Sequence, residues 1–131
     1  MSTSAQGYLV ILEAFAKKHY CKDFEKRASW SVTWKSLEQT FARFDPDLLA
    51  GKLEPALKIS DDRTLTLYKY SFRMADENKS AKASGNRVIL VVDEGHQTIR
   101  VLLVYHKNHV KGDRETDWFM KLIYDEYENL P

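Results

Sequence analysis

The sequence predicts a single α+β domain that spans residues 1–131. Between residues 13 and 48 the apolar side chains recur every three or four positions, as they do in amphipathic helices. Residues 65–105 contain three apolar or alternating runs separated by polar segments, which is typical of neighbouring strands. Residues 115–127 return to helical spacing. Separate blocks of helix and strand favour the α+β class, and the chain is long enough for one sizeable core.

The composition points to a cytoplasmic protein without a membrane partner. Cys21 is the only cysteine, so an internal disulfide and a cysteine-rich zinc site are both excluded. No apolar run approaches the roughly 20 residues of a membrane span. The opening "MSTSAQG" has no basic residue of the kind that begins a signal peptide. The four histidines show no recognised metal spacing, and we expect neither a metal nor a cofactor.

The first half of the chain predicts a strand followed by a helical hairpin. The apolar run from Tyr8 to about Leu12 reads as a short strand, and residues 13–27 read as an amphipathic helix. A second helix is predicted to start near Ser31. Its apolar stripe consists of Trp34, Leu37, Phe41, Phe44 and Leu48. The segment "LLAGKLEPALKISDD", residues 48–62, reads as a connector.

The second half predicts three strands and a closing helix. From Leu65 the pattern alternates, so that Lys69, Ser71 and Arg73 share one face. The aromatic face of this strand contains Thr66, Tyr68, Tyr70 and Phe72. A polar loop at 74–83 then leads to strands at 87–92 and 98–105. The apolar set of the closing helix is Trp118, Phe119, Leu122, Ile123 and Tyr127.

Charge is distributed unevenly along the chain although the net charge is only +1. Residues 63–114 hold ten Lys/Arg and five Asp/Glu, whereas residues 115–131 hold one and five. A local positive excess can bind phosphate within a Debye length of about 10 Å. We therefore expect the acidic closing helix to lie beside the basic segment and to screen it. A merely solvated basic sheet edge is the alternative.

The predicted order of elements and three segments resemble the RelE/ParE toxin superfamily. These segments are "LYKYSFRM", "SGNRVILVV" and "IRVLLVYHKN", in which strands begin or end in basic residues. The resemblance covers roughly residues 8–127. It implies an N-terminal strand, a helical hairpin, a three-stranded antiparallel meander and a C-terminal helix. It also implies a toxin-like endoribonuclease that cleaves mRNA, usually at the ribosome, and a small antitoxin protein as partner; ParE-like members instead act on DNA gyrase.

Three basic residues are the first candidates for catalysis. By resemblance, Lys69, Arg73 and Arg87 match the basic positions of the family on the second and third strands. Metal-free RNA cleavage needs cations for the charge on phosphorus and groups that exchange protons. Arg can contact a phosphate with two N–H groups, and Lys supplies a point charge. Ordinary solvated charges at strand ends are the alternative reading.

The end of the last strand supplies further candidates. His106 can exchange a proton near neutral pH, and Lys107 matches the basic residue that follows the last strand in the family. Alternation places Tyr105 and Lys107 on one face and His106 on the other, and a purely structural histidine remains an open reading. The residues expected to contact RNA are Lys79, Lys82, Tyr105 and His109. The alternative functions are a non-catalytic module of the same fold that binds RNA or protein, and a gyrase-targeting toxin of the ParE-like type that the resemblance also implies.

Overall fold

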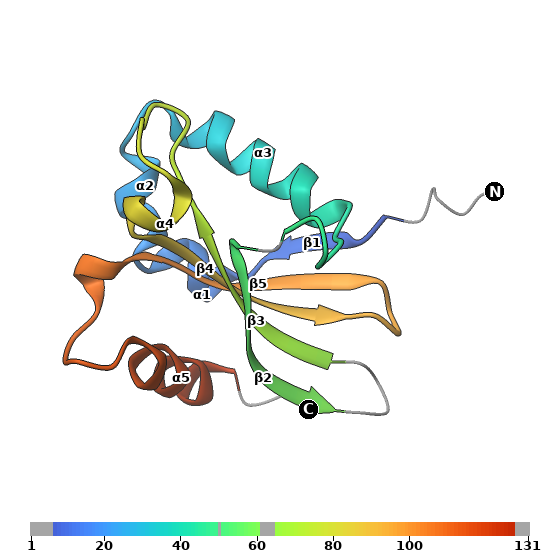
Figure 1. The fold of residues 1–131 in the computed structure, drawn as a ribbon. Helices are drawn as coiled ribbons and strands as arrows, with labels where there is room; N and C mark the ends of the chain where they lie inside the picture. The colour runs from blue at the N-terminus through green and yellow to red at the C-terminus, as the bar shows by residue number, and fades with distance from the viewer. Residues whose placement is uncertain (1–6, 50, 61–64, 128–131) are drawn as a thin grey trace.

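The computed structural model describes residues 7–49, 51–60 and 65–127 (Figure 1). The first half contains β1 (Leu9–Leu12), α1 (Ala14–Lys18), α2 (Cys21–Glu25), α3 (Trp30–Ala42) and β2 (Leu53–Ser60). The second half contains β3 (Leu65–Phe72), α4 (Ala81–Ser84), β4 (Asn86–Asp93), β5 (Thr98–His106), the 3-10 turn η2 (Lys107–His109) and α5 (Glu115–Glu126). None of the helices in this described part of the chain is long and apolar enough to cross a bilayer.

The strands form one five-stranded sheet in the order β1-β5-β4-β3-β2. β2 to β5 make an antiparallel meander, and β1 pairs in parallel with β5. The predicted three-stranded meander is therefore too short, because β2 occupies part of the segment 48–62 that was expected to be a connector. Pro55 lacks a backbone donor, and the register of β2 slips twice against β3, so this edge strand shows no regular alternation.

The predicted helix at 13–27 is also wrong, because α1 and α2 are two short helices that are broken at His19 and Tyr20. Tyr20 has a positive φ of 36°, which a continuous helix does not permit. Its ring packs 4.8 Å from the His109 ring and 5.5 Å from the Trp118 ring, measured between centroids. Aromatic packing against η2 and α5 thus accompanies the break. The second helix begins at Trp30, close to the predicted Ser31.

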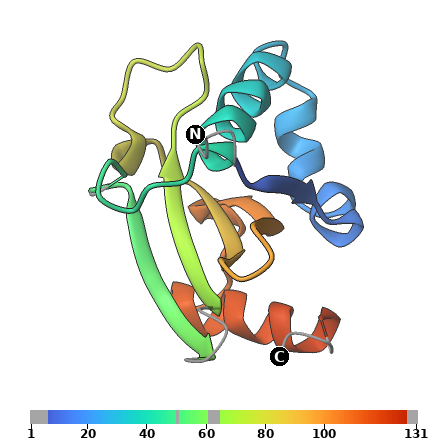
Figure 2. The ribbon, with the colours of Figure 1, turned by 90° about the vertical axis from the view of Figure 1, so that its right-hand side faces the viewer.

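Helices cover both faces of the sheet, with α2 and α3 on one side and α5 on the other (Figures 1 and 2). On the α3 side, Phe41 is fully buried in a cluster with Tyr70, Phe72 and Val88. The aromatic face predicted for β3 is therefore confirmed as a core face. On the α5 side, the core cluster includes Leu65, Leu67, Ile89, Val91, Leu102, Leu103, Tyr105, Phe119 and Ile123.

A β-bulge in β5 determines on which side of the sheet the side chains at the end of that strand lie. Leu90 pairs with Val101 and Ile89 pairs with Leu103, so Leu102 has no partner on β4. Val101 belongs to the core on the α3 side, whereas Leu102 and Leu103 both belong to the core on the α5 side. An extra residue of this kind reverses the alternation that follows it. After the bulge the odd-numbered residues Leu103 and Tyr105 therefore lie on the α5 side, whereas Ile99 and Val101 before it lie on the α3 side.

The bulge is tied to the end of the last helix. The hydroxyl of Tyr127 donates a hydrogen bond of 2.7 Å to the backbone carbonyl of Leu102. The guanidinium of Arg100 lies 5.8 Å from the centroid of the Tyr127 ring and donates 2.8 Å to Glu13. Cation–π contacts of this length are attractive. The residue that follows α5 is thus hydrogen-bonded to Leu102, the bulged residue of β5.

We predict that Tyr127→Phe lowers the free energy of unfolding by about 1 kcal/mol, because it leaves a buried carbonyl without its donor. Urea denaturation monitored by circular dichroism measures the change. Tyr124→Phe is the matched control on the same helix, since Tyr124 is 63% exposed. Equal stability of the two variants would contradict a stabilising role for the Tyr127 hydroxyl.

Candidate functional site

Two of the predicted basic residues meet one carboxylate on the α5 side of the sheet. One oxygen of Glu115, Oε2, lies 3.8 Å from Lys69 Nζ and 3.8 Å from Arg87 Nε. The same oxygen accepts a hydrogen bond of 2.5 Å from the hydroxyl of Tyr105. We call these four residues the Glu115 cluster. They come from β3, β4, β5 and the first residue of α5.

The sheet register explains this convergence. Arg87 pairs directly with Tyr105, and Lys69 pairs with Ile89, two residues further along β4. Direct and diagonal neighbours on one face of a sheet are within reach of long side chains. Tyr105 joins this face only because the bulge at Leu102 precedes it. The cluster thus depends on the pairing of three strands.

The Glu115 cluster is half-buried and carries a positive excess. The side chains of Lys69, Arg87 and Glu115 are 19%, 12% and 26% exposed. The guanidinium of Arg87 is held by the carbonyls of Asn86 and Lys82 at 3.1 and 3.3 Å, and its Nε is buried with no hydrogen-bond partner among the described residues. Two cations therefore face one carboxylate. Low exposure strengthens their interaction with any anion that replaces it.

Tyr105 lies beneath this carboxylate and is fully buried. Burial raises the pKa of the phenol, and its hydrogen bond to Glu115 raises the pKa further. The hydroxyl therefore stays protonated and acts as a donor. The Trp118 ring of α5 packs edge-on at 5.1 Å from the Tyr105 ring. The predicted contact between Tyr105 and RNA would thus require the start of α5 to move.

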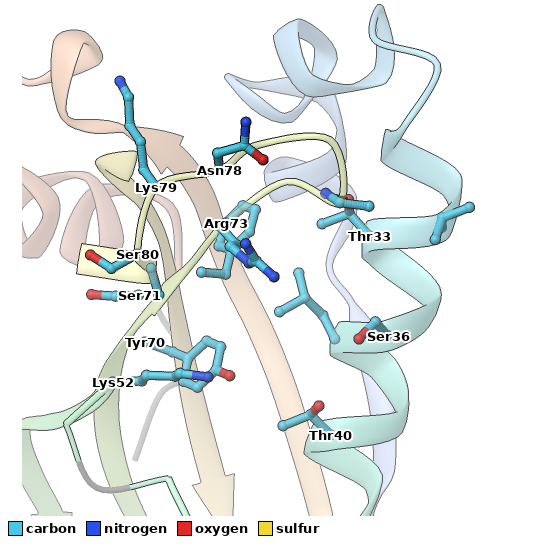
Figure 3. Close-up of a pocket in the computed structure, with 15 residues that line it drawn as sticks. Thr33, Ser36, Thr40, Lys52, Tyr70, Ser71, Arg73, Asn78, Lys79 and Ser80 are labelled. Carbon is cyan, nitrogen blue, oxygen red and sulfur yellow. Dashed lines mark hydrogen bonds between the residues drawn. The ribbon is translucent and has the colours of Figure 1, made fainter. Parts of the chain in front are cut away.

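Arg73 does not join Lys69 and Arg87, which corrects the expected grouping of the three. β3 ends at Phe72, so Arg73 lies beyond the strand. Its guanidinium donates 3.0 Å to the carbonyl of Glu77, and the side chain lines a hollow between β3 and α3, on the opposite side of the sheet from α5 (Figure 3). Alternation along a strand cannot be extended past the point where the chain leaves the sheet.

The two loop lysines also lie apart from the Glu115 cluster. Lys79 stands at the rim of the hollow beside α3 and points outward (Figure 3). Lys82, in α4, forms an exposed ion pair of 3.9 Å with Glu54 on β2. Exposed pairs of this kind contribute little to stability, so both lysines remain accessible to a partner.

His106 lies on the opposite face from Tyr105, as alternation predicts, and both of its ring nitrogens are engaged. Nδ1 accepts from the backbone N–H of Asn108 at 3.0 Å, so Nε2 carries the proton and donates 2.9 Å to the carbonyl of Ser84. Burial lowers the pKa of the ring. Gly85 has a φ of +81°, and a Cβ there would lie 2.8 Å from Nε2. His106 thus fastens the end of β5 to the start of β4.

His109 completes this turn and connects it to α2. Its Nδ1 accepts from the backbone N–H of His106 at 2.9 Å, and its Nε2 lies 2.8 Å from the carboxylate of Asp23. The hydrogen bond from His109 lowers the pKa of Asp23. Lys107 is exposed at the start of the turn, and its backbone N–H donates 2.9 Å to Gly85. The two histidines therefore have structural partners, whereas the ammonium of Lys107 is accessible.

Glu115 is the residue of this site that sequence reasoning did not single out. The available signal was its position in the first turn of an acidic helix that follows a basic segment. The expected position of the acidic helix beside the basic segment is confirmed at this point, where Glu115 lies 3.8 Å from both Lys69 and Arg87; the screening itself stays a prediction. Among the described residues, no group of three His, Cys, Asp or Glu side chains could hold a metal ion. Cys21 is buried, and burial raises the pKa of its thiol to about 12.

We predict that acidification below about pH 6.5 destabilises the protein partly through His106. Because the pKa of His106 is lower in the folded protein, the unfolded chain binds this proton more readily. The stability that the neutral ring contributes is therefore fully present above the ordinary pKa of 6.5 and is lost as the pH falls through the lower pKa of the folded state. His106→Gln can keep both hydrogen bonds without titrating. Urea denaturation at pH 7.5 and 5.5 should show a smaller acid-induced loss in His106→Gln than in the wild type. An equal acid-induced loss in His106→Gln and in the wild type would refute the assignment.

Comparisons with known proteins identify the fold. No protein-family model matches the chain, and no curated protein sequence matches it. The crystal structure of an archaeal RelE-RelB complex from Pyrococcus horikoshii OT3 is similar to it, with a TM-score of 0.50 and 14% sequence identity. The similarity covers 79% of this chain and 99% of that chain. The resemblance inferred from the sequence is therefore confirmed for the architecture: the chain has a RelE-like fold.

Proposed function

We propose that the protein is a toxin-like endoribonuclease that cleaves mRNA at the Glu115 cluster. The observation that carries this proposal is the convergence of Lys69 and Arg87 on one carboxylate oxygen within a RelE-like fold. The similar archaeal RelE was crystallised with RelB. By analogy we propose a small antitoxin protein as partner, and mRNA with or without the ribosome as target. These targets place the proposed activity in the cytoplasm.

An RNA phosphate can take the place that Glu115 occupies. Both groups present negatively charged oxygens to the same two cations. Arg87 is held in a fixed orientation by two backbone carbonyls, and Lys69 adds a point charge from the neighbouring strand. Such an arrangement stabilises the negative charge that develops on the non-bridging phosphate oxygens during cleavage. Electrostatic stabilisation of this kind is the largest contribution in many enzymes.

Glu115 can then act as the general base. In this mechanism its carboxylate takes the proton of the ribose 2′-hydroxyl, and the 2′-oxygen bonds to phosphorus. The bond from phosphorus to the 5′-oxygen breaks, and the ammonium of Lys69 donates a proton to that oxygen. The products are a 2′,3′-cyclic phosphate and a 5′-hydroxyl end. Once the phosphate has displaced the carboxylate from Lys69 and Arg87, the hydrogen bond from Tyr105 would keep Glu115 beside the 2′-hydroxyl.

A non-catalytic module that binds RNA is the second candidate. One observation favours it. Both ring nitrogens of His106, the predicted acid–base residue, are already hydrogen-bonded to backbone groups, so this histidine has no free nitrogen for proton transfer. In this case Lys69 and Arg87 would hold the RNA backbone without cutting it. The two candidates differ in the chemistry of the RNA ends.

Mapping of RNA ends tests the proposal. We expect the wild-type protein, incubated with mRNA in the presence and absence of ribosomes, to produce new 5′-hydroxyl ends. Lys69→Gln and Arg87→Gln should each slow cleavage by roughly 10²-fold or more, the scale for the loss of one electrostatic donor. Lys35→Gln on α3 is the control for the loss of an exposed charge. Binding without new ends under both conditions would replace the nuclease with the binding module.

Glu115→Gln separates affinity from chemistry. Removing the negative charge should strengthen RNA binding, because the phosphate no longer competes with a carboxylate for the two cations. Removing the base should slow cleavage by about 10²- to 10⁴-fold. Filter binding and single-turnover cleavage measure the two effects, with Asp117→Gln as the control in the same helical turn. Unchanged affinity would argue against screening, and unchanged cleavage would assign the base to another group.

A further inference from the structure

The hollow that Arg73 lines lies between α3 and the end of β3, on the other side of the sheet from the Glu115 cluster (Figure 3). Its volume is about 610 Å³, within the range of roughly 300–1,000 Å³ that is usual for small-molecule sites. The segment 73–81, between β3 and α4, closes one end. Because the Glu115 cluster is on the α5 side, this hollow is separate from the proposed cleavage site.

The lining combines positive charge, hydroxyl groups and apolar surface. The cations are Lys52 just before β2, Arg73 just after β3, and Lys79 at the rim, and Figure 3 shows Arg73 directed toward α3. Thr33, Ser36 and Thr40 line the helical wall. The apolar part of the lining comprises Val32, Leu37, Tyr70 and Phe72. None of the described residues that line the hollow is an Asp or a Glu.

The acidic residues of the neighbouring loop are directed elsewhere by specific bonds. Glu77 accepts from the backbone N–H of Met74 at 2.7 Å and from the side chain of Asn86 at 2.9 Å. Asp76 pairs with Arg27 at 2.9 Å, on the side of α2. The carboxylates of this loop are therefore bound to groups outside the hollow, whereas the guanidinium of Arg73 lines it.

The same loop is fixed in place before any ligand binds. The backbone N–H of Ala75 donates 2.8 Å to the hydroxyl of Thr33, which in turn donates 2.8 Å to the carbonyl of Ser29. Among the described residues, only the carbonyl of Glu77 accepts a hydrogen bond from Arg73. The remaining donors of this guanidinium are available to an anion. A preformed site costs less ordering free energy on binding.

We propose that this hollow binds a nucleotide of the size of a nucleoside monophosphate. Arg73 and Lys52 would hold the phosphate, since a guanidinium can donate two hydrogen bonds to it. Ser36 and Thr40 would bind the ribose hydroxyls. The base would pack against Val32 and Leu37. The nucleotide is either free or part of an RNA strand, and the two sources share this chemistry.

Calorimetric titration with adenosine 5′-monophosphate tests the site. We expect saturable binding that Arg73→Gln and Lys52→Gln each weaken by roughly tenfold or more, which corresponds to about 1.4 kcal/mol. Lys35→Gln, on α3 but outside the lining, is the control and should bind as the wild type does. Inorganic phosphate and adenosine alone should each bind more weakly than the nucleotide. Thermal unfolding confirms that each variant is folded.

Three results would overturn the proposal. These are the absence of saturable binding, wild-type affinity in both Arg73→Gln and Lys52→Gln, or binding of inorganic phosphate as tight as that of the nucleotide. Competition by hexa-adenylate would identify an RNA strand as the source, and its absence would identify a free nucleotide. The Lys69→Gln/Arg87→Gln double variant should keep its affinity for the nucleotide, so failure of the cleavage proposal leaves this test intact.

Discussion

The extra residue at Leu102 is the constraint on which the site depends. Without it, Tyr105 would follow Ile99 and Val101 onto the α3 side of the sheet, and no phenol would lie beside Arg87. With it, the second half of β5 presents Leu103 and Tyr105 to α5. Bulges are common near functional sites because they change the direction of a side chain without changing the topology. One extra residue therefore determines which side chains of the second half of β5 face α5.

The last helix is held at both ends by polar contacts made near the buried surface. Glu115 contacts the cations at its first residue, and Tyr127 contacts the bulge just beyond its last residue. An ion pair that is largely withdrawn from water contributes little net stability, because desolvation offsets most of the attraction. In the proposed function, an RNA phosphate that replaces the carboxylate would therefore have little net stabilisation to overcome. The hydrophobic contacts of Phe119 and Ile123 can keep the helix in place during that exchange.

Regular patterns were predictable from the sequence, and irregular ones were not. Alternation located β3, apolar runs located β4 and β5, and helical spacing located α5 and the start of α3 within one or two residues. The predicted stripe of the second helix ran on to Phe44 and Leu48, whereas α3 ends at Ala42. The bulge could not be found in this way, because "RVLLVY" is apolar at four successive positions and an inserted leucine leaves the pattern intact. Arg73 was misplaced because β3 ends one residue earlier. The turn at Tyr20 depends on contacts with His109 and Trp118, which are distant in sequence.

Charge gave more information about the site than local motifs did. The segment sums predicted that the acidic helix would lie on the basic strands, and Glu115 does so. The roles of single residues were harder to predict, because the segment "YHKNH" places His106 and His109 close together at a strand end, as acid–base residues often are. Their partners are backbone groups and Asp23, which only the folded chain brings together.

The irregular edge of the sheet has a consequence for how copies of this protein meet. An exposed strand with a continuous row of N–H and C=O groups is a template for another chain. β2 interrupts that row, because Pro55 has no N–H and the pairing with β3 slips on both sides of Leu57 and Lys58. A neighbouring molecule would find too few consecutive donors there to extend the sheet. The irregularity that hid β2 from sequence reasoning thus disfavours aggregation along this edge.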